Sequence, residues 1–139
     1  MKFEFVIPGE PQGKGRPRVT TIAGHARAYT PDKTVSYESL IKWCWAQQYG
    51  NINPSTVPIR MHINAYYTIP ASDSKNKRAA KLAGSIYPTK KVDADNLAKI
   101  VADSLNGLAY CDDVQIVDMH VYKRYGDQPR VDVTVEEVE

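Results

Sequence analysis

The sequence predicts a single α+β domain over residues 1–139, with a mainly antiparallel or mixed sheet and two principal helices. Three observations favour this class. The length suits one hydrophobic core. Several segments alternate apolar and polar residues, as strands do, and two others place apolar residues at helical spacing. The sequence contains no internal repeat or linker that would divide the chain into two domains.

Alternation of apolar and polar residues predicts the strands. The predicted strands span residues 2–7, 57–69, 114–124 and 130–138. The alternation is clearest from Ile59 to Ile69, where every second side chain is apolar. Segments 114–124 and 130–138 are close together in the chain and predict a closing hairpin. Residues 19–22 and 26–29 predict a second, smaller hairpin that turns at Gly24.

Two segments predict the main helices. Thr30 and Pro31 are typical of a helix start, and Gly50 is typical of its end. Within this helix Trp43 and Trp45 cannot both face the core, so one of them is expected to be exposed. Residues 95–106 predict the second helix, and the basic segment 71–91 predicts a short helix with a loop.

Charge is divided unevenly along the chain. Residues 1–91 contain 14 Lys and Arg against 5 Asp and Glu, which gives +9, whereas residues 92–139 contain 4 against 11, which gives −7. A basic surface beside an acidic cluster suits an enzyme that holds a polyanion and binds a cation. The alternative is charge segregation on a solvated surface without a function.

Several classes of protein do not fit this sequence. No apolar run approaches the roughly 20 residues of a membrane helix, and the N-terminus has no signal-peptide pattern, so a cytoplasmic protein without a membrane partner is expected. Cys44 and Cys111 are far apart, which favours reduced thiols. The three histidines are scattered, which argues against a zinc site or a catalytic histidine.

The residues that indicate chemistry lie between positions 92 and 115. In the predicted helix, Asp95, Lys99 and Asp103 share one face, opposite an apolar stripe of Leu97, Val101 and Leu105. Asp93 comes just before this helix, and Asp112 and Asp113 follow it, where a returning strand can bring them beside Asp93 and Asp95. Carboxylates from two segments, close to a lysine, are what a magnesium site requires.

Each of these residues also has a simpler interpretation. Asp93 or Asp95 can cap the helix, and Lys99 can form an i,i+4 ion pair with Asp95. Asp112 and Asp113 can be turn residues. One helix cap does not need two aspartates and a second acidic pair downstream, and this surplus favours a metal site.

The same stretch resembles the RusA family of Holliday-junction resolvases. The matching residues are Asp93-Ala94-Asp95-Asn96-Leu97-Ala98-Lys99, then Asp103-Ser104-Leu105-Asn106, then Asp112-Asp113-Val114-Gln115. A weaker likeness extends to the N-terminal strand and to the Gly-Lys-Gly-Arg-Pro-Arg loop, so the resemblance covers most of the chain. The chain is similar in particular to the small members carried by phages and prophages.

The resemblance implies a homodimer that binds four-way DNA junctions and cuts two opposed strands, in DNA recombination and repair. It implies that Asp93, Asp95 and Asp113 bind Mg²⁺, with Mn²⁺ able to substitute, and that Lys99 is the catalytic lysine. Asn96, Asp103 and Asp112 are supporting candidates. Charge alone predicts the DNA-binding residues, which are Lys14, Arg16, Arg18, Lys75, Lys77, Arg78, Lys81, Lys90 and Lys91.

Two other functions remain open on the sequence. One is a nuclease of the same fold that prefers flaps or replication forks. The other is a DNA-binding module whose acidic cluster is structural and which never cuts. Cleavage of a four-way junction, compared with a duplex of the same sequence, distinguishes the three. The sequence does not determine the preferred cut dinucleotide, the number of metal ions, the dimer interface or the host pathway.

Overall fold

A four-stranded mixed sheet forms the centre of the computed structural model, in the order β1-β6-β4-β5. The strands are β1 (Lys2–Pro8), β4 (Ile59–Thr68), β5 (Ile116–Gly126) and β6 (Arg130–Glu137). β6 is antiparallel to both β1 and β4, whereas β4 and β5 are parallel. The structure describes all residues except 15–17, 23, 30 and 31, and it describes no side chains for 18–22, 25–29 and 33. The predicted α+β class is confirmed.

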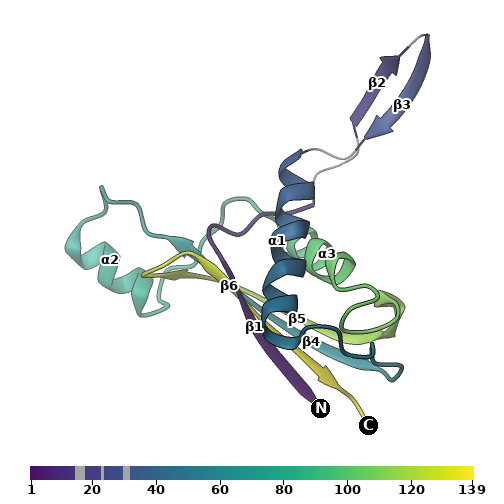
Figure 1. Cartoon of the computed structure of the whole chain (residues 1–139). Coiled ribbons are helices and arrows are strands. Elements are labelled where there is room, and N and C mark those ends of the chain that lie inside the picture. The colour runs from purple at the N-terminus through teal and green to yellow at the C-terminus, as the bar shows by residue number, and fades with distance from the viewer. Residues whose placement is uncertain (15–17, 23, 30–31) are drawn as a thin grey trace.

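The core lies on one face of this sheet. Along β4, every second residue from Ile59 to Tyr67 is buried, as the alternation predicts. The buried faces of β1 and β6 alternate in the same way. Helices α1 (Asp32–Tyr49) and α3 (Ala94–Ser104) cover this face (Figure 1).

The two tryptophans of α1 take opposite positions. Trp45 is fully buried, with its ring centroid 5.5 Å from that of Phe3 and 5.6 Å from that of Phe5. Trp43 is 60% exposed. The prediction that one of the two faces outward is therefore confirmed, and Trp43 is the exposed one. The predicted cap residues of this helix, Thr30 and Pro31, lie outside the described residues.

The prediction that segments 114–124 and 130–138 form a hairpin is wrong. Both strands are present, as β5 and β6, but β4 lies between them and pairs with both. In the central position, the backbone groups along both edges of β4 are hydrogen-bonded. Every second residue of β4 is also buried, which suits a strand in the middle of the sheet. The connection at residues 127–129 therefore crosses the end of β4, and residues 113–115 form a short 3₁₀ helix, η1 (Asp113–Gln115).

Two smaller elements extend from this body (Figure 1). Strands β2 (Arg18–Ile22) and β3 (His25–Tyr29) form the predicted hairpin, and Gly24 in its turn has a φ of 80°. Helix α2 (Lys75–Leu82) begins where Ser74 accepts a hydrogen bond from the backbone amide of Lys77, at 3.2 Å. None of the described helices is long and apolar enough to cross a membrane.

Candidate active site

Asp93 stands at the N-cap position of α3. Its backbone is extended, with φ −64° and ψ 147°, and its carbonyl accepts the first helical bond from Leu97 at 3.0 Å. Among the described residues, its exposed carboxylate forms no cap hydrogen bond with the helix. Asp95, in the first turn, is also exposed. The capping interpretation therefore does not account for the Asp93 side chain, which is left facing solvent at the positive end of the helix dipole.

The backbone before Asp93 is held by Tyr67 of β4. The Tyr67 hydroxyl donates to the carbonyl of Val92 and accepts from its amide, each at 3.3 Å. Burial raises the pKa of Tyr67, and the charges of Glu10 and Asp93 raise it further, although the Val92 backbone hydrogen bond opposes the shift. The position of Asp93 is thus set by a residue of the central strand.

A second pair of carboxylates meets at the other end of α3. Asp103, whose side chain is 20% exposed, lies within hydrogen-bonding reach of Asp113 in η1. Tyr110 helps to fix this end of the helix, because its hydroxyl donates to the carbonyl of Ala102 at 2.6 Å. The Asp113 pKa is raised by Asp112, by burial and by the Asp103 carboxylate, as expected where like charges are close.

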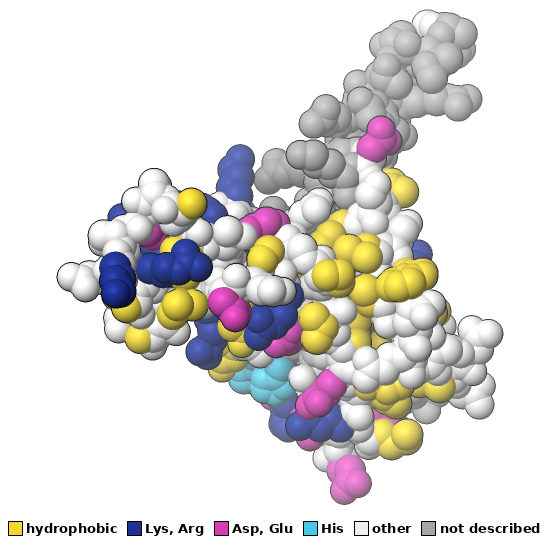
Figure 2. Space-filling model, turned by 60° about the vertical axis from the view of Figure 1, so that its left-hand side comes forward, with side chains coloured by type: hydrophobic (Ala, Val, Ile, Leu, Met, Phe, Trp, Pro, Cys, Tyr) yellow, Lys and Arg dark blue, Asp and Glu magenta, His cyan; other side chains and the backbone are white. Residues whose placement is uncertain are grey.

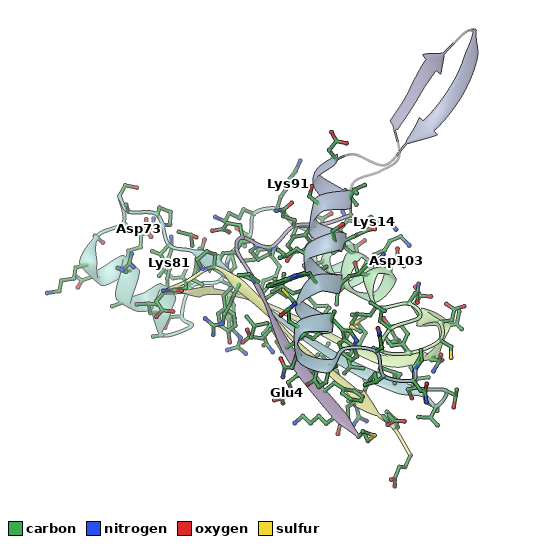
Figure 3. The ribbon with its side chains drawn as sticks, in the orientation of Figure 1. Glu4, Lys14, Asp73, Lys81, Lys91 and Asp103 are labelled. Atoms are coloured by element: carbon green, nitrogen blue, oxygen red, sulfur yellow. The ribbon has the colours of Figure 1, made fainter. Side chains whose placement is uncertain are left out.

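Two lysines lie beside Asp103, and one of them also approaches a glutamate. The Nζ atom of Lys14 lies 2.5 Å from Oδ2 of Asp103, and that of Lys99 lies 3.7 Å from the same oxygen. Lys14 is also 3.8 Å from Glu38 of α1. Burial alone would raise the pKa of Asp103, but the Lys14 and Asp113 hydrogen bonds and the two ammonium charges hold it below its ordinary value. Figure 3 shows Lys14 and Asp103 close together beside α1 and α3.

Asp112 and Gln115 hold η1 in place. The Asp112 carboxylate accepts from the amide of Val114 at 3.4 Å, while the Gln115 side chain accepts from the Asp112 amide at 2.9 Å. Gln115 also donates to the carbonyls of Ser55 and Val57, at 2.8 and 3.0 Å. The turn interpretation therefore fits Asp112, and this network positions the neighbouring Asp113 beside Asp103.

The predicted carboxylates occupy two places along α3. Asp95 and Asp103 are eight positions apart, which corresponds to about 12 Å along a helix. Among the described residues, His, Cys, Asp and Glu side chains form no group of three or more that could hold a metal ion. The structure thus brings Asp113 to Asp103 at the end of α3, and it leaves Asp93 and Asp95 at the beginning. Lys99 does form an i,i+4 ion pair, but with Asp103 and not with Asp95, the partner in the simpler interpretation.

The predicted DNA-binding residues differ in exposure. Lys75, Lys77 and Arg78 are exposed on α2, and Lys90 and Lys91 are exposed in the following loop. Figure 2 shows several Lys and Arg side chains at the surface of this part of the molecule. In contrast, the Lys81 side chain is 7% exposed, pairs with Asp73 at 2.5 Å and lies 4.5 Å from the ring centroid of Tyr125. This environment makes Lys81 a packing residue and does not fit a phosphate contact. Arg16 and the side chain of Arg18 lie outside the described residues.

Two residues near the site are absent from the sequence prediction. Lys123 of β5 donates to the carbonyl of Lys90 at 2.7 Å and lies 5.4 Å from the ring centroid of Tyr67, beside the loop that leads to Asp93. Glu38 of α1 is the second carboxylate near Lys14. Neither had a local signal, because an isolated charge on a strand or helix is typical of any solvated face.

An α+β domain that combines exposed carboxylates, adjacent lysines and a basic helix has the features of a phosphodiester-cleaving enzyme. The family model of the endodeoxyribonuclease RusA matches residues 8–136, which is nearly the whole chain. The protein therefore belongs to the RusA family of endodeoxyribonucleases, as the resemblance of its motifs predicts. The family acts on branched DNA in recombination.

A search of curated proteins gives a relative from Bacillus subtilis (strain 168), described as the uncharacterized protein YqaN. It is 36% identical over 141 residues, which cover 98% of this chain and 96% of the relative. The similarity therefore extends along nearly the whole length of both proteins.

Proposed function

We propose that this protein is a structure-selective endonuclease that resolves Holliday junctions by magnesium-dependent, paired hydrolysis of phosphodiester bonds in a homodimer. The observation that carries the proposal is the Asp93 carboxylate, which is exposed at the N-terminus of α3 and makes no cap bond among the described residues. It begins the Asp-x-Asp-Asn-Leu-x-Lys motif of a chain that belongs to a family of DNA endonucleases.

The candidate ligands are carboxylates, which are the oxygen donors that a hard divalent cation prefers. The pKa of Asp113 is raised, first by Asp112, then by burial and then by the nearby Asp103 carboxylate. A bound cation would relieve this repulsion. The motif assigns Mg²⁺, or Mn²⁺ in its place, to Asp93, Asp95 and Asp113, whereas in the structure Asp113 lies beside Asp103 and not beside the other two. A metal held there would supply an activated water and would neutralise charge on the phosphate.

The remaining side chains have roles in holding the substrate. Lys99, whose side chain is 62% exposed, lies one turn beyond Asp95 and is available to stabilise charge that develops on the phosphate. The exposed charges of α2, with Lys90 and Lys91, support contact with the DNA backbone. Contacts to phosphates carry no sequence information, so they suit recognition of a branched shape.

A homodimer follows from the substrate. One chain provides one acidic site, whereas resolution needs two opposed cuts in a nearly two-fold junction. Trp43, 60% exposed on α1, is a candidate for the interface between the two protomers. Sedimentation should give twice the chain mass of 15.6 kDa. A supercoiled cruciform plasmid should give linear product; a monomer that accumulates nicked circles would contradict paired cutting.

The decisive experiment compares a labelled four-way junction, a flap and a duplex of the same sequence, with Mg²⁺, with Mn²⁺ and with a chelator. The junction should be cut in the presence of either metal, and the chelator should stop the reaction. Asp93→Asn, Asp95→Asn and Asp113→Asn should each bind the junction without cutting it, because the amide loses the charge that attracts the metal. Asp127→Asn, at an exposed acidic residue in the β5–β6 connection, is the matched control.

The same experiment distinguishes the two other functions. Preferential cleavage of the flap would assign the protein to branched-DNA nucleases that act on flaps or forks. Equal binding with and without metal, without any cleavage, would make it a DNA-binding module. Substantial cutting by one of the three Asn variants would remove that aspartate from the essential set.

A further inference from the structure

Lys14 lies at the centre of a long-range ionic contact. It is located in the segment between β1 and β2, and its ammonium group reaches Asp103 of α3 at 2.5 Å, across 89 residues of sequence. Glu38 of α1 lies 3.8 Å from the same ammonium. The Lys14 side chain is only 29% exposed. One lysine thus connects a loop and two helices at the acidic end of α3.

The loop that carries Lys14 is also fixed at the opposite end of α3. At Gly13, a Cβ atom would overlap Cγ2 of Val92 and would lie 3.1 Å from Cβ of Asn96. The loop therefore passes directly over the first turn of α3, where only a glycine fits. Lys14 then extends to Asp103 near the last turn. Residues 13 and 14 together contact both ends of the helix that carries the candidate site.

The preceding residues attach this loop to the sheet. The Glu10 carboxylate accepts hydrogen bonds from both the amide and the hydroxyl of Thr68, at the end of β4. The Gly9 amide donates to the carbonyl of Pro129 at 3.2 Å. The loop at residues 9–14 is therefore held by backbone and side-chain bonds before it reaches α3.

These contacts distinguish Lys14 from the lysines of α2. Lys75 and Lys77 are exposed and form no ion pair with another described residue, so they can meet a phosphate without breaking one. The Lys14 ammonium is already close to two carboxylates, and its hydrogen bond with Asp103 is charge-assisted. Moving it to a phosphate would leave Asp103 partly buried without its nearest cation.

We propose that Lys14 is a positioning residue of the candidate active site: it fixes Asp103, and with it Asp113, relative to the start of α3. This inference rests on the proposed function, because the carboxylates are taken to act in cleavage. It reverses the expectation from sequence that Lys14 contacts DNA. Lys14 acts through Asp103 and does not itself touch the substrate.

The test uses Lys14→Met, Lys14→Arg and Asp103→Asn in the full-length protein, with Lys42→Met on the exposed face of α1 as the matched control. Lys14→Met should lower the single-turnover rate on a four-way junction by about tenfold or more, while the Kd changes less than about twofold. Lys14→Arg keeps the charge and should recover most of the rate. Lys42→Met should cut like the original protein.

Salt dependence separates positioning from DNA contact. The slope of log affinity against log salt should be the same for Lys14→Met and the original protein. A slope reduced by about 0.9, the value for one phosphate contact, together with an unchanged rate at saturation, would overturn the proposal. Lys14→Met combined with Asp103→Asn should lower the rate no further than the more severe single change; additive losses would also overturn it.

Two measurements without DNA keep this inference separate from the proposed function. The affinity of the free protein for Mn²⁺ can be measured from the electron paramagnetic resonance signal of the ion. This affinity should change in Lys14→Met and remain unchanged in Lys42→Met. In urea unfolding, the losses of unfolding free energy caused by Lys14→Met and by Asp103→Asn should not add in the double variant. If the original protein cuts no branched DNA, the proposed function fails. Unchanged Mn²⁺ binding and additive unfolding shifts would instead reject the role of Lys14.

Discussion

The hydroxyl group of Tyr67 lies 3.3 Å from both the nitrogen and the carbonyl oxygen of Val92, the residue directly before Asp93. Lys90 and Lys123 lie beside the same ring, at 5.6 and 5.4 Å from its centroid. The Asp93 side chain makes no cap hydrogen bond among the described residues. Instead, a core tyrosine of the central strand determines where the first motif residue stands, and it connects the sheet directly to the candidate chemistry.

We expect Tyr67→Phe to lower activity more than stability. The ring stays in the core, and only the two hydrogen bonds to Val92 are lost, which costs about 1–3 kcal/mol of unfolding free energy. The single-turnover rate on a four-way junction should fall because Asp93 is less well positioned, while the Kd is nearly unchanged. Tyr66→Phe, on the opposite face of β4, is the matched control. Equal rates for both variants would disconnect Tyr67 from the site.

Lys99→Ala should slow cleavage without weakening binding. The Lys99 side chain is 62% exposed and pairs with Asp103 only at 3.7 Å, so its removal should hardly affect stability. If Lys99 stabilises charge that develops on the phosphate, its removal should lower the single-turnover rate by about a hundredfold or more. Lys42→Ala serves as the control. Full activity in Lys99→Ala would reduce the side chain to a surface ion pair.

The exposed charges of α2 should control the salt dependence of binding. Replacing Lys75, Lys77 and Arg78 together with Gln should reduce the slope of log affinity against log salt by up to about 2.7, at 0.9 per phosphate contact. Titrations between low and moderate salt, with the junction and the duplex, measure this slope. Lys2→Gln with Lys42→Gln should leave it unchanged. An unaltered slope in the α2 variant would mean that this helix does not touch DNA.

The Asp73–Lys81 pair should make stability depend on acidity. The hydrogen bond from Lys81 lowers the pKa of Asp73 from its ordinary value of 3.8, with burial opposing the shift. A lowered folded-state pKa contributes stability that is present above 3.8 and is lost as the pH falls through the folded-state value.

Asp73→Asn should therefore be less stable than the original protein near neutral pH, and the difference should shrink in strong acid. Urea unfolding across this pH range measures both proteins. Asp127→Asn, which replaces an exposed aspartate, should show no comparable pH-dependent difference. A constant destabilisation of Asp73→Asn at every pH would assign its effect to packing, since the charge would then make no difference.

Much of the local structure could be predicted from the sequence. The alternation from Ile59 to Tyr67 gave both the strand and its buried face. The stripe of Leu97, Val101 and Leu105 identified the buried face of α3, and all three are fully buried. The motif residues between 93 and 115 pointed to the endodeoxyribonuclease family. The sequence left two alternatives open that the structure decides. Asp112 is a capping residue of a turn, and Trp43, not Trp45, is the exposed tryptophan.

The sequence could not give the arrangement of the carboxylates. It allowed a returning strand to bring Asp113 beside Asp93 and Asp95, but η1 meets the opposite end of α3, so Asp113 meets Asp103. The charge pattern also treated Lys14 and Lys81 as surface residues. Both are in ion pairs with carboxylates, at 2.5 Å in each case. A charged residue carries no local signal of the partner that it will meet.

By itself, then, the sequence determined the elements, their buried faces and the family. These properties depend on backbone periodicity and on residues that are neighbours in the chain. Only the tertiary structure decided that β4 separates β5 from β6, that Tyr67 holds the backbone before Asp93, and that Lys14 reaches Asp103. These contacts join residues 25 or more positions apart. They form because the whole core packs closely with its backbone groups hydrogen-bonded, and this depends on all the segments together.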